Sequence, residues 1–260
     1  AYGGADCRLG PASARRFISY PDEERACIMA EEVSIRVNFS RPMPLFPLGQ
    51  VVMLPQQITP LHIFEPRYRQ MVSRALDSSG QIAMARIAGS LVTGPTPPLK
   101  PAVCVGQIVQ HETLEDGRYN IILQGVCRAR IVEEDEPDED RMYRQAMLEP
   151  IEDDEDESLR AEGFRDWIRD ELDSGELRRL AAADELKKLV SNEQIPSPVL
   201  VEIISFALVT DDATRYALLA EGSLDRRARL VQSNLDGLAS LIRKAVAQKP
   251  GEWPKGTSWN

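Results

Sequence analysis

The sequence is poor in the residues that most often build metal and catalytic sites. Its 260 residues include two histidines and four cysteines, and the cysteines, Cys7, Cys27, Cys104 and Cys127, are scattered without a C-x-x-C pair. A zinc site of cysteine and histidine therefore lacks its usual ligand spacing. The cysteines are instead expected to be structural thiols in a reducing compartment.

Long apolar runs and excess positive charge are also missing. The sequence contains no run of about 18 apolar residues that could form a transmembrane helix. It also has no basic-then-apolar leader that would mark a secretory signal. We therefore expect a cytoplasmic protein without a membrane partner. The formal net charge is -10, and such a field repels polyanions and disfavours nucleic acid as a partner. The sequence begins at Ala1, not at a methionine, which suggests processing or truncation.

Composition divides the chain into four parts. Residues 1–41 are expected to be a partly disordered extension, in which VSIRVNF at 33–39 alternates like a strand and could add one edge strand. Residues 42–151 predict a β-domain, residues 158–247 a helical bundle, and residues 248–260 a tail. Acid runs at 133–140 and 152–157 are expected to stay in water.

The β-part shows strands, one hairpin and one helix. PLFPL at 44–48 and QITPLHIF at 57–64 suit strand ends or edge strands because proline cannot donate to a ladder, and QIAMARIA at 81–88 alternates like a strand. The runs 102–114 and 118–132 flank EDG at 115–117, which predicts a hairpin with Gly117 at positive φ. Gly106 and Gly125 predict bulges or bends in these strands. A helix is expected over 66–76, with Pro66 in its first turn.

Five helices are expected in the C-terminal part. Ser158 caps the first, which ends at Gly175, and the apolar residues of 177–189 carry a second. The third has Ser197 as its cap and belongs at the bundle centre because apolar residues surround it. A short helix over 211–221 precedes the last one, over 223–247. Its seam of Ala228, Val231, Leu235, Leu238, Ile242 and Ala245 could face the protein's own bundle or pair two chains into a homodimer.

Two long segments together resemble a known family. PLFPLGQVVMLPQQITPLHIFEPRYRQMV at 44–72, followed by VGQIVQHETLEDGRYNIILQGVCRARI at 105–131, is similar to the N-terminal, substrate-binding domain of the Lon proteases. The resemblance covers roughly residues 42–247 and implies an α+β fold, a PUA-like β-barrel with one inserted helix followed by a C-terminal α-helical bundle. The residues that carry it as a structural signature are Pro47, Leu48, His62, Ile63, Phe64, Glu65, Pro66, Arg67, Tyr68, Gly106, Gly117, Arg118 and Gly125.

The catalytic modules of a Lon protease are not visible in the sequence. No Gly-Lys dipeptide occurs, so no ATP-binding P-loop can form, and the resemblance places the Ser-Lys protease dyad beyond the end of this chain. The chain is therefore expected to be a stand-alone Lon N-terminal domain without enzymatic activity, cofactor or metal.

The corner LHIFEPRY at 61–68 allows a catalytic and a structural interpretation. His62 could act as a base oriented by Glu65, but no nucleophile lies nearby in sequence. In the structural interpretation, Ile63 and Phe64 anchor the strand in the barrel, and Glu65 accepts from helix amides or pairs with Arg67 or Arg69. Tyr68 then packs in the core. We expect the structural role, and we expect His111 to be exposed or satisfied in the core, not a metal ligand.

One loop is the local candidate for ligand binding. The segment 89–101 is rich in proline, and its apolar side chains could contact an extended peptide. The alternative is a poorly ordered hairpin tip. The candidate residues are Leu91, Val92, Pro97, Pro98 and Leu99.

The resemblance implies a non-catalytic module that recognises exposed apolar segments of unfolded or partly folded polypeptides and that could serve as an adaptor for a separate protease. The alternative is RNA binding, because PUA-like folds are often used in that way. Its only support is the arginines of CRAR at 127–130 and RMYR at 141–144, which lie beside acid runs. A third interpretation, a small hydrolase, has no motif behind it, and calcium binding by DDEDE at 153–157 lacks the glycine and closing glutamate of an EF-hand.

Overall fold

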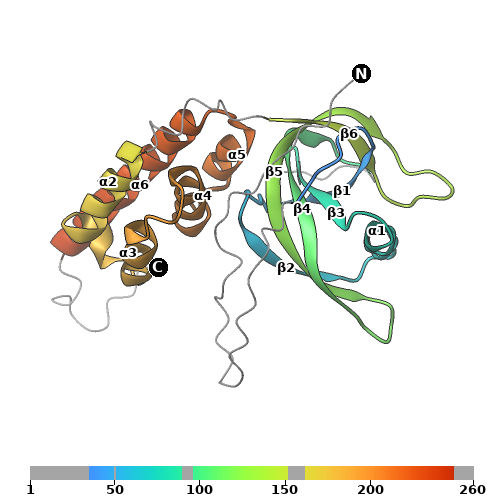
Figure 1. Cartoon of the computed structure of the whole chain (residues 1–260), viewed down its shortest axis with the longest axis horizontal. Coiled ribbons are helices and arrows are strands. Elements are labelled where there is room, and N and C mark those ends of the chain that lie inside the picture. The colour runs from blue at the N-terminus through green and yellow to red at the C-terminus, as the bar shows by residue number, and fades with distance from the viewer. Residues whose placement is uncertain (1–34, 50, 90–95, 152–161, 249–260) are drawn as a thin grey trace.

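The structure is a computed structural model, which describes residues 35–49, 51–89, 96–151 and 162–248. A β-barrel lies on one side of the molecule and a layer of helices on the other (Figure 1). The strands are β1 (Met43–Leu48), β2 (Ile58–Ile63), β3 (Gln81–Ile87), β4 (Leu99–Thr113), β5 (Tyr119–Asp135) and β6 (Gln145–Pro150). The helices are α1 (Pro66–Leu76), α2 (Glu162–Asp173), α3 (Ala183–Ser191), α4 (Ser197–Leu208), α5 (Asp212–Ala220) and α6 (Leu224–Ala247), with a short 3-10 helix at Glu176–Arg179.

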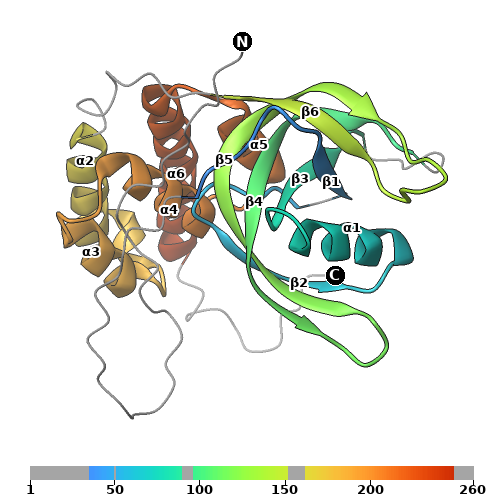
Figure 2. The same cartoon turned by 45° about the vertical axis from the view of Figure 1, so that its right-hand side comes forward.

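The long strand β5 closes the barrel. The sheet has the order β2-β5-β4-β3-β1-β6, and β6 pairs with β5 again. The first half of β5 pairs with β2 over residues 119–124, and its second half pairs with β6 over residues 129–135. The sheet is therefore a ring on the β6 side (Figure 2), whereas β2 is an edge strand among the described strands. Proline at position 60 fits that edge position.

The faces of β3 show why the barrel is apolar on both sides. Ile82 and Met84 join the main core, which extends to the helices, while Ala83 and Ala85 join a second, smaller core. Alternate residues of a strand point to opposite faces, so the alternation in the sequence corresponds to two buried faces. In the main core, α1 follows the predicted bounds and packs Tyr68 edge-on against Phe46, with ring centroids 4.6 Å apart.

The strand glycines are bulges, as predicted. Gly106 pairs with Gly125, and the β4–β5 register shifts beside this pair. A Cβ at Gly125 would lie 2.3 Å from the carbonyl oxygen of Leu54, so the 51–57 loop can approach β5 only where the side chain is missing. Gly117 has φ +76° in the hairpin turn, again as predicted.

The helical part differs from the sequence prediction at two places. The expected second helix is broken into the 3-10 helix and α3, because Leu180 takes an extended conformation between them. Ser197 lies inside α4, whose N-cap is Pro196, so the predicted serine cap is wrong there. Ser158 lies outside the described residues.

In the N-terminal extension, residues 35–39 do not form a strand, although Val37 packs into the smaller core.

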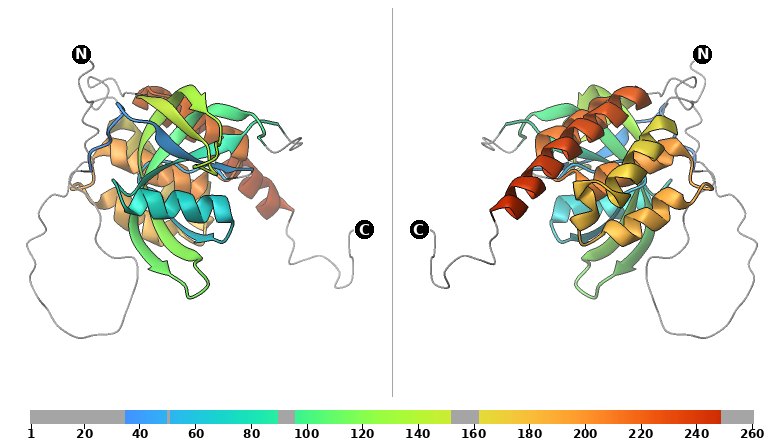
Figure 3. Two further views of the ribbon diagram at one scale, coloured as in Figure 1. Left: turned by 90° about the vertical axis from the view of Figure 1, so that its right-hand side faces the viewer. Right: turned by 90° about the vertical axis from the view of Figure 1, so that its left-hand side faces the viewer.

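The predicted starts of the last two helices, at 211 and 223, are confirmed to within one residue. Asp211 and Ser223 cap α5 and α6 by accepting from the third residue after each, and the hydrogen bonds from Thr214 lower the pKa of Asp211. The apolar helix α4 is largely buried. α6 runs along the helical layer (Figure 3) and turns Ala228, Val231 and Leu235 of its seam into the protein's own core.

A buried ion triad joins the barrel to the helices. Glu202 of α4 accepts from Nη2 of Arg128, on β5, at 2.7 Å, and its other oxygen lies 3.1 Å from Nε of Arg227, on α6. The side chains of the three residues are at most 8% exposed. The guanidinium groups also donate to the carbonyls of Leu218 and Glu221 at the C-terminal end of α5.

α5 itself is fastened to the barrel by polar contacts. The hydroxyl of Tyr216 accepts from the backbone N–H of Ala102 at 2.9 Å, and Arg215 donates to the side-chain oxygen of Gln57 at 2.8 Å. Asp212 pairs with Arg86 of β3 at 3.2 Å. Barrel and helices are thus one packed unit with a continuous core.

Glu202→Gln is expected to lower the free energy of unfolding by about 3–5 kcal/mol, because the buried guanidinium groups of Arg128 and Arg227 lose a carboxylate with which both pair. Urea unfolding followed by circular dichroism measures the change. In the matched control, Glu149→Gln breaks a 54% exposed ion pair with Arg130 and should cost less than about 0.5 kcal/mol. Equal losses in the two variants would contradict the role given to the triad.

Gly125→Ala is expected to destabilise the fold by about 1–3 kcal/mol, because the new methyl group meets the rigid backbone of Leu54. The control is Gly237→Ala in α6, where no atom lies within 4 Å of the new Cβ, and it should stabilise by about 0.5–1 kcal/mol. Unfolding midpoints that move in the same direction would show that the close approach at Gly125 is unimportant.

Candidate peptide-binding surface

The loop singled out from the sequence is only partly described. Leu91 and Val92 lie outside the described residues. The carbonyl of Pro97 accepts from Arg144 at 2.6 Å, the carbonyl of Pro98 accepts from the Ala88 amide at 2.8 Å, and Leu99 packs against the smaller core. The described end of the loop is therefore tied to the barrel, and its role in peptide binding stays a prediction.

Exposed apolar side chains lie at the two ends of β2. Ile58, at its start, and Phe64, directly after its end, are each 60% exposed, and Val109 is exposed at a bulge of β4, the second strand from β2. The remaining exposed large hydrophobic side chains of the described residues are Val51, Val132, Met142, Leu241 and Val246. Neither Ile58 nor Val109 was singled out from the sequence, although the exposed position of Ile58 follows from its alternation with Thr59 and Leu61.

The outer side of β2 and its neighbours forms what we call the β2 face. Ile58, Pro60 and His62 lie opposite Gln124, Ile122 and Asn120 of β5. These in turn lie opposite Gln107, Gln110 and Glu112 of β4. Residues directly opposite in a sheet point to the same face. Exposed apolar groups therefore lie at both ends of β2, with Pro60 and His62 between them. The neighbouring side chains of β5 and β4 on this face are polar except for Ile122.

A chain of hydrogen bonds holds His62 on this face. Its Nδ1 lies 2.7 Å from Oδ1 of Asn120, whose amide nitrogen donates to Glu112 at 2.9 Å. Because the amide nitrogen of Asn120 donates to Glu112, it is the amide oxygen of Asn120 that faces His62. This oxygen can only accept, so Nδ1 of His62 carries the proton and donates. Nε2 then accepts from Nη1 of Arg118 at 3.3 Å. The ring also stacks on Phe64, with centroids 6.2 Å apart.

The corner itself agrees with the structural interpretation except at Phe64. Ile63 is buried and Pro66 occupies the first turn of α1. Phe64 does not anchor the strand in the barrel, because the chain leaves β2 at this point and turns the ring to the solvent. Glu65 pairs with Arg67 at 2.8 Å and makes no side-chain cap, so it does not orient His62. Burial in the core raises the pKa of Tyr68 against the opposing charge of Arg67.

The arginines offered by the sequence as an RNA surface are mostly internal. Arg128, Arg141 and Arg144 are buried, and Arg144 pairs with Glu134. Arg130 is exposed but pairs with Glu149. The RNA interpretation therefore loses the feature that supported it.

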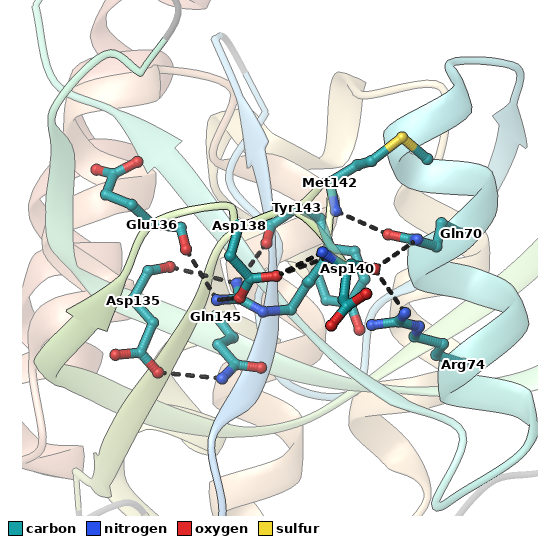
Figure 4. Close-up of polar contacts among 10 residues, drawn as sticks. Gln70, Arg74, Asp135, Glu136, Asp138, Asp140, Met142, Tyr143 and Gln145 are labelled. Atoms are coloured by element: carbon teal, nitrogen blue, oxygen red, sulfur yellow. Dashed lines mark hydrogen bonds and ion pairs between the residues drawn. The ribbon is translucent and has the colours of Figure 1, made fainter.

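The acid run 133–140 is organised around one of these arginines, which the sequence did not indicate. Arg141 donates to Asp138 and to the carbonyls of Glu136 and Tyr143. The backbone N–H of Arg141 lowers the pKa of Asp138. Figure 4 shows how this turn reaches α1, where the carbonyl of Asp140 accepts from both Gln70 and Arg74, at 3.0 and 2.7 Å.

Thiols and metal ligands add no reactive centre to the described part of the chain. Cys104 is fully buried, which raises its pKa to about 12, and it is not in a disulfide. His111 is exposed on β4. Within the described ranges, no three histidine, cysteine, aspartate or glutamate side chains come together as metal ligands, and the run 153–157 lies outside these ranges.

Phe64→Ser is expected to change the free energy of unfolding by less than about 0.5 kcal/mol, because its ring is mainly in solvent. Its neighbour Ile63 is 2% exposed, and Ile63→Ala should cost about 2–5 kcal/mol. Chemical denaturation of the two variants checks this contrast. A large loss of unfolding free energy for Phe64→Ser would show that Phe64 contributes to the core after all.

Comparison with known proteins identifies the family. The model of the ATP-dependent protease La (LON) substrate-binding domain matches residues 42–237. Lon protease 1 of Syntrophobacter fumaroxidans is 30% identical over 209 residues, which are 79% of this chain and 23% of that protein. The chain therefore spans about a quarter of this curated relative. None of the helices in the described ranges has the length and apolar character needed to cross a membrane.

Solved structures show the same fold. The N-terminal domain of the Mycobacterium avium complex Lon protease superposes with a TM-score of 0.54 at 18% identity, covering 74% of this chain and 96% of that one. The Lon N-terminal domain protein from Xanthomonas campestris gives a TM-score of 0.47 at 19% identity, covering 74% and 98%. Family match and fold agree with the motifs at 44–72 and 105–131, and the chain belongs to the Lon substrate-binding domain family.

Proposed function

We propose that this chain is a non-catalytic module that recognises exposed apolar segments of unfolded polypeptides through the β2 face. Membership of the Lon substrate-binding domain family supports substrate recognition as its general role. The observation that carries the finer proposal is the pair of exposed apolar side chains, Ile58 and Phe64, at the two ends of an edge strand. Exposed apolar groups on a sheet edge suit an extended chain.

The chemistry of the β2 face favours binding over catalysis. His62 is held by Asn120 and Arg118, and no hydroxyl or thiol of the described residues makes a hydrogen bond with it. Affinity should be modest because a disordered ligand loses conformational entropy on binding. We further propose that the module acts in the cytoplasm and delivers its ligands to a separate protease as an adaptor.

Pairing of two copies through α6 remains a separate proposal. Three residues of the seam are buried in the protein's own core, and Leu238 and Ile242 are partly buried and pack against it. Among the described seam residues, only Ala245 is exposed, so a second chain would meet the seam near the end of α6.

The binding proposal is tested by fluorescence anisotropy with a labelled, reduced and carboxymethylated polypeptide. We expect saturable binding at tens of micromolar protein, and no saturable binding in that range contradicts the proposal. Ile58→Ser and Phe64→Ser should each weaken binding roughly fivefold to tenfold, since removing most of an apolar contact costs on the order of 1 kcal/mol. The matched control is Val132→Ser, because Val132 is 62% exposed but lies in the half of β5 that pairs with β6. Equal loss in this control would place the binding elsewhere.

A further inference from the structure

The register of β2 shows which of its backbone groups are available. Gly125 donates its backbone N–H to the carbonyl of Gln57 at 2.9 Å, and these two residues continue the register that pairs Ile58 with Gln124. In an antiparallel pair, hydrogen-bonded pairs alternate with non-hydrogen-bonded ones. Odd-numbered residues from Gln57 onward therefore direct their backbone groups toward β5. The even-numbered residues direct theirs away from it, namely Ile58, Pro60 and His62.

The outward groups of β2 have no protein partner in the part of the chain that the structure describes. β2 pairs there with β5 alone, and no hydrogen bond from another described element reaches the backbone of Ile58 or His62. Proline occupies the central outward position, where its missing N–H costs the β2–β5 ladder nothing. The edge thus offers three carbonyl acceptors and two N–H donors to an incoming chain, with one donor position empty in the middle.

We propose that an extended segment of an unfolded polypeptide adds to the sheet as a strand along the free edge of β2, hydrogen-bonded to Ile58 and His62. This inference rests on the proposed function and specifies how the ligand is held. The unpaired backbone groups select an extended backbone over a folded helix, whose own N–H and C=O groups are already paired.

The outer face specifies the spacing of the ligand's side chains. Residues directly opposite Ile58 and His62 in an added strand are four apart and point to the same side as these two. One of them meets the exposed Ile58, and the other meets the stacked rings of His62 and Phe64. The ligand class is therefore an extended segment with apolar side chains at positions i and i+4. The residue at i+2 lies opposite Pro60.

The missing backbone N–H of Pro60 provides a test that leaves the exposed side chains of Ile58 and Phe64 unchanged. The probe is a labelled peptide of serine and threonine with two leucines four residues apart, titrated by anisotropy. Pro60→Ala restores the outward N–H and should tighten binding roughly threefold to tenfold, the effect of one added hydrogen bond. His62→Pro removes an outward N–H and should weaken binding by a similar factor relative to His62→Ala, which loses the same side chain but keeps the amide.

Amide exchange by NMR gives a second readout that does not depend on a variant. In the free protein, the amides of Ile58 and His62 should exchange much faster than those of Thr59, Leu61 and Ile63. Added peptide should slow exchange at Ile58 and His62. This measurement also applies if His62→Pro fails to fold.

The outcomes separate this inference from the proposed function. If peptide binding is unchanged by Pro60→Ala and leaves the two outward amides unprotected, strand addition is wrong, while a loss of affinity in Phe64→Ser would keep the β2 face as the binding surface. If neither the peptide nor the carboxymethylated polypeptide binds, the proposed function itself is wrong. A peptide with its leucines three residues apart should bind more weakly, and equal binding would overturn the spacing.

Discussion

The charge balance around Glu202 constrains the whole molecule. One carboxylate serves two buried guanidinium groups, from β5 and from α6, so three charged groups lie together inside the protein. Burial of charge is costly unless other groups compensate it. The carbonyls of Leu218 and Glu221 do so here, because they lie at the C-terminal end of α5, where the helix dipole is negative. Barrel, α4, α5 and α6 must therefore assemble together to satisfy the cluster.

The double use of β5 has a similar effect on the barrel. A strand of 17 residues is long enough to pair with β6 at one end and with β2 at the other. The ring closes only on the β6 side, and β2 keeps an unpaired edge. Natural sheets usually protect such edges, and the proline and the hydrogen-bonded His62 are the devices found here. They reduce uncontrolled strand pairing without covering the edge.

Local pattern accounts for what the sequence could predict. The bounds of α1, the hairpin at Gly117, the bulge at Gly106 and Gly125, and the starts of α5 and α6 all depend on residues close in sequence, where backbone stereochemistry decides the outcome. The alternation of β3 also indicated a strand, but not that both of its faces are buried. The family resemblance then supplied the arrangement of these elements.

Long-range contacts account for what it could not predict. Arg128 and Glu202 are 74 residues apart in sequence, and nothing in CRAR distinguishes a buried arginine from an exposed one. The acid run gave no sign that Arg141 would organise it. Phe64 stands at the end of an apolar run, which suggested a core position. The strand ends one residue before it, at Ile63, and the ring of Phe64 is exposed. The β2 face likewise depends on register, which a sequence without its strand partners does not fix.

The close approach of Leu54 to Gly125 has a consequence for recognition. Arg128 lies three positions after Gly125, so β5 is held by a close backbone approach at one point and by an ion pair at the other. These contacts oppose sliding or twisting of the strand that supports β2. Under the proposed strand addition, nearly the whole entropic cost of binding would therefore fall on the added polypeptide. Such a site would favour a segment that can become extended, which an unfolded polypeptide can do more readily than a folded protein.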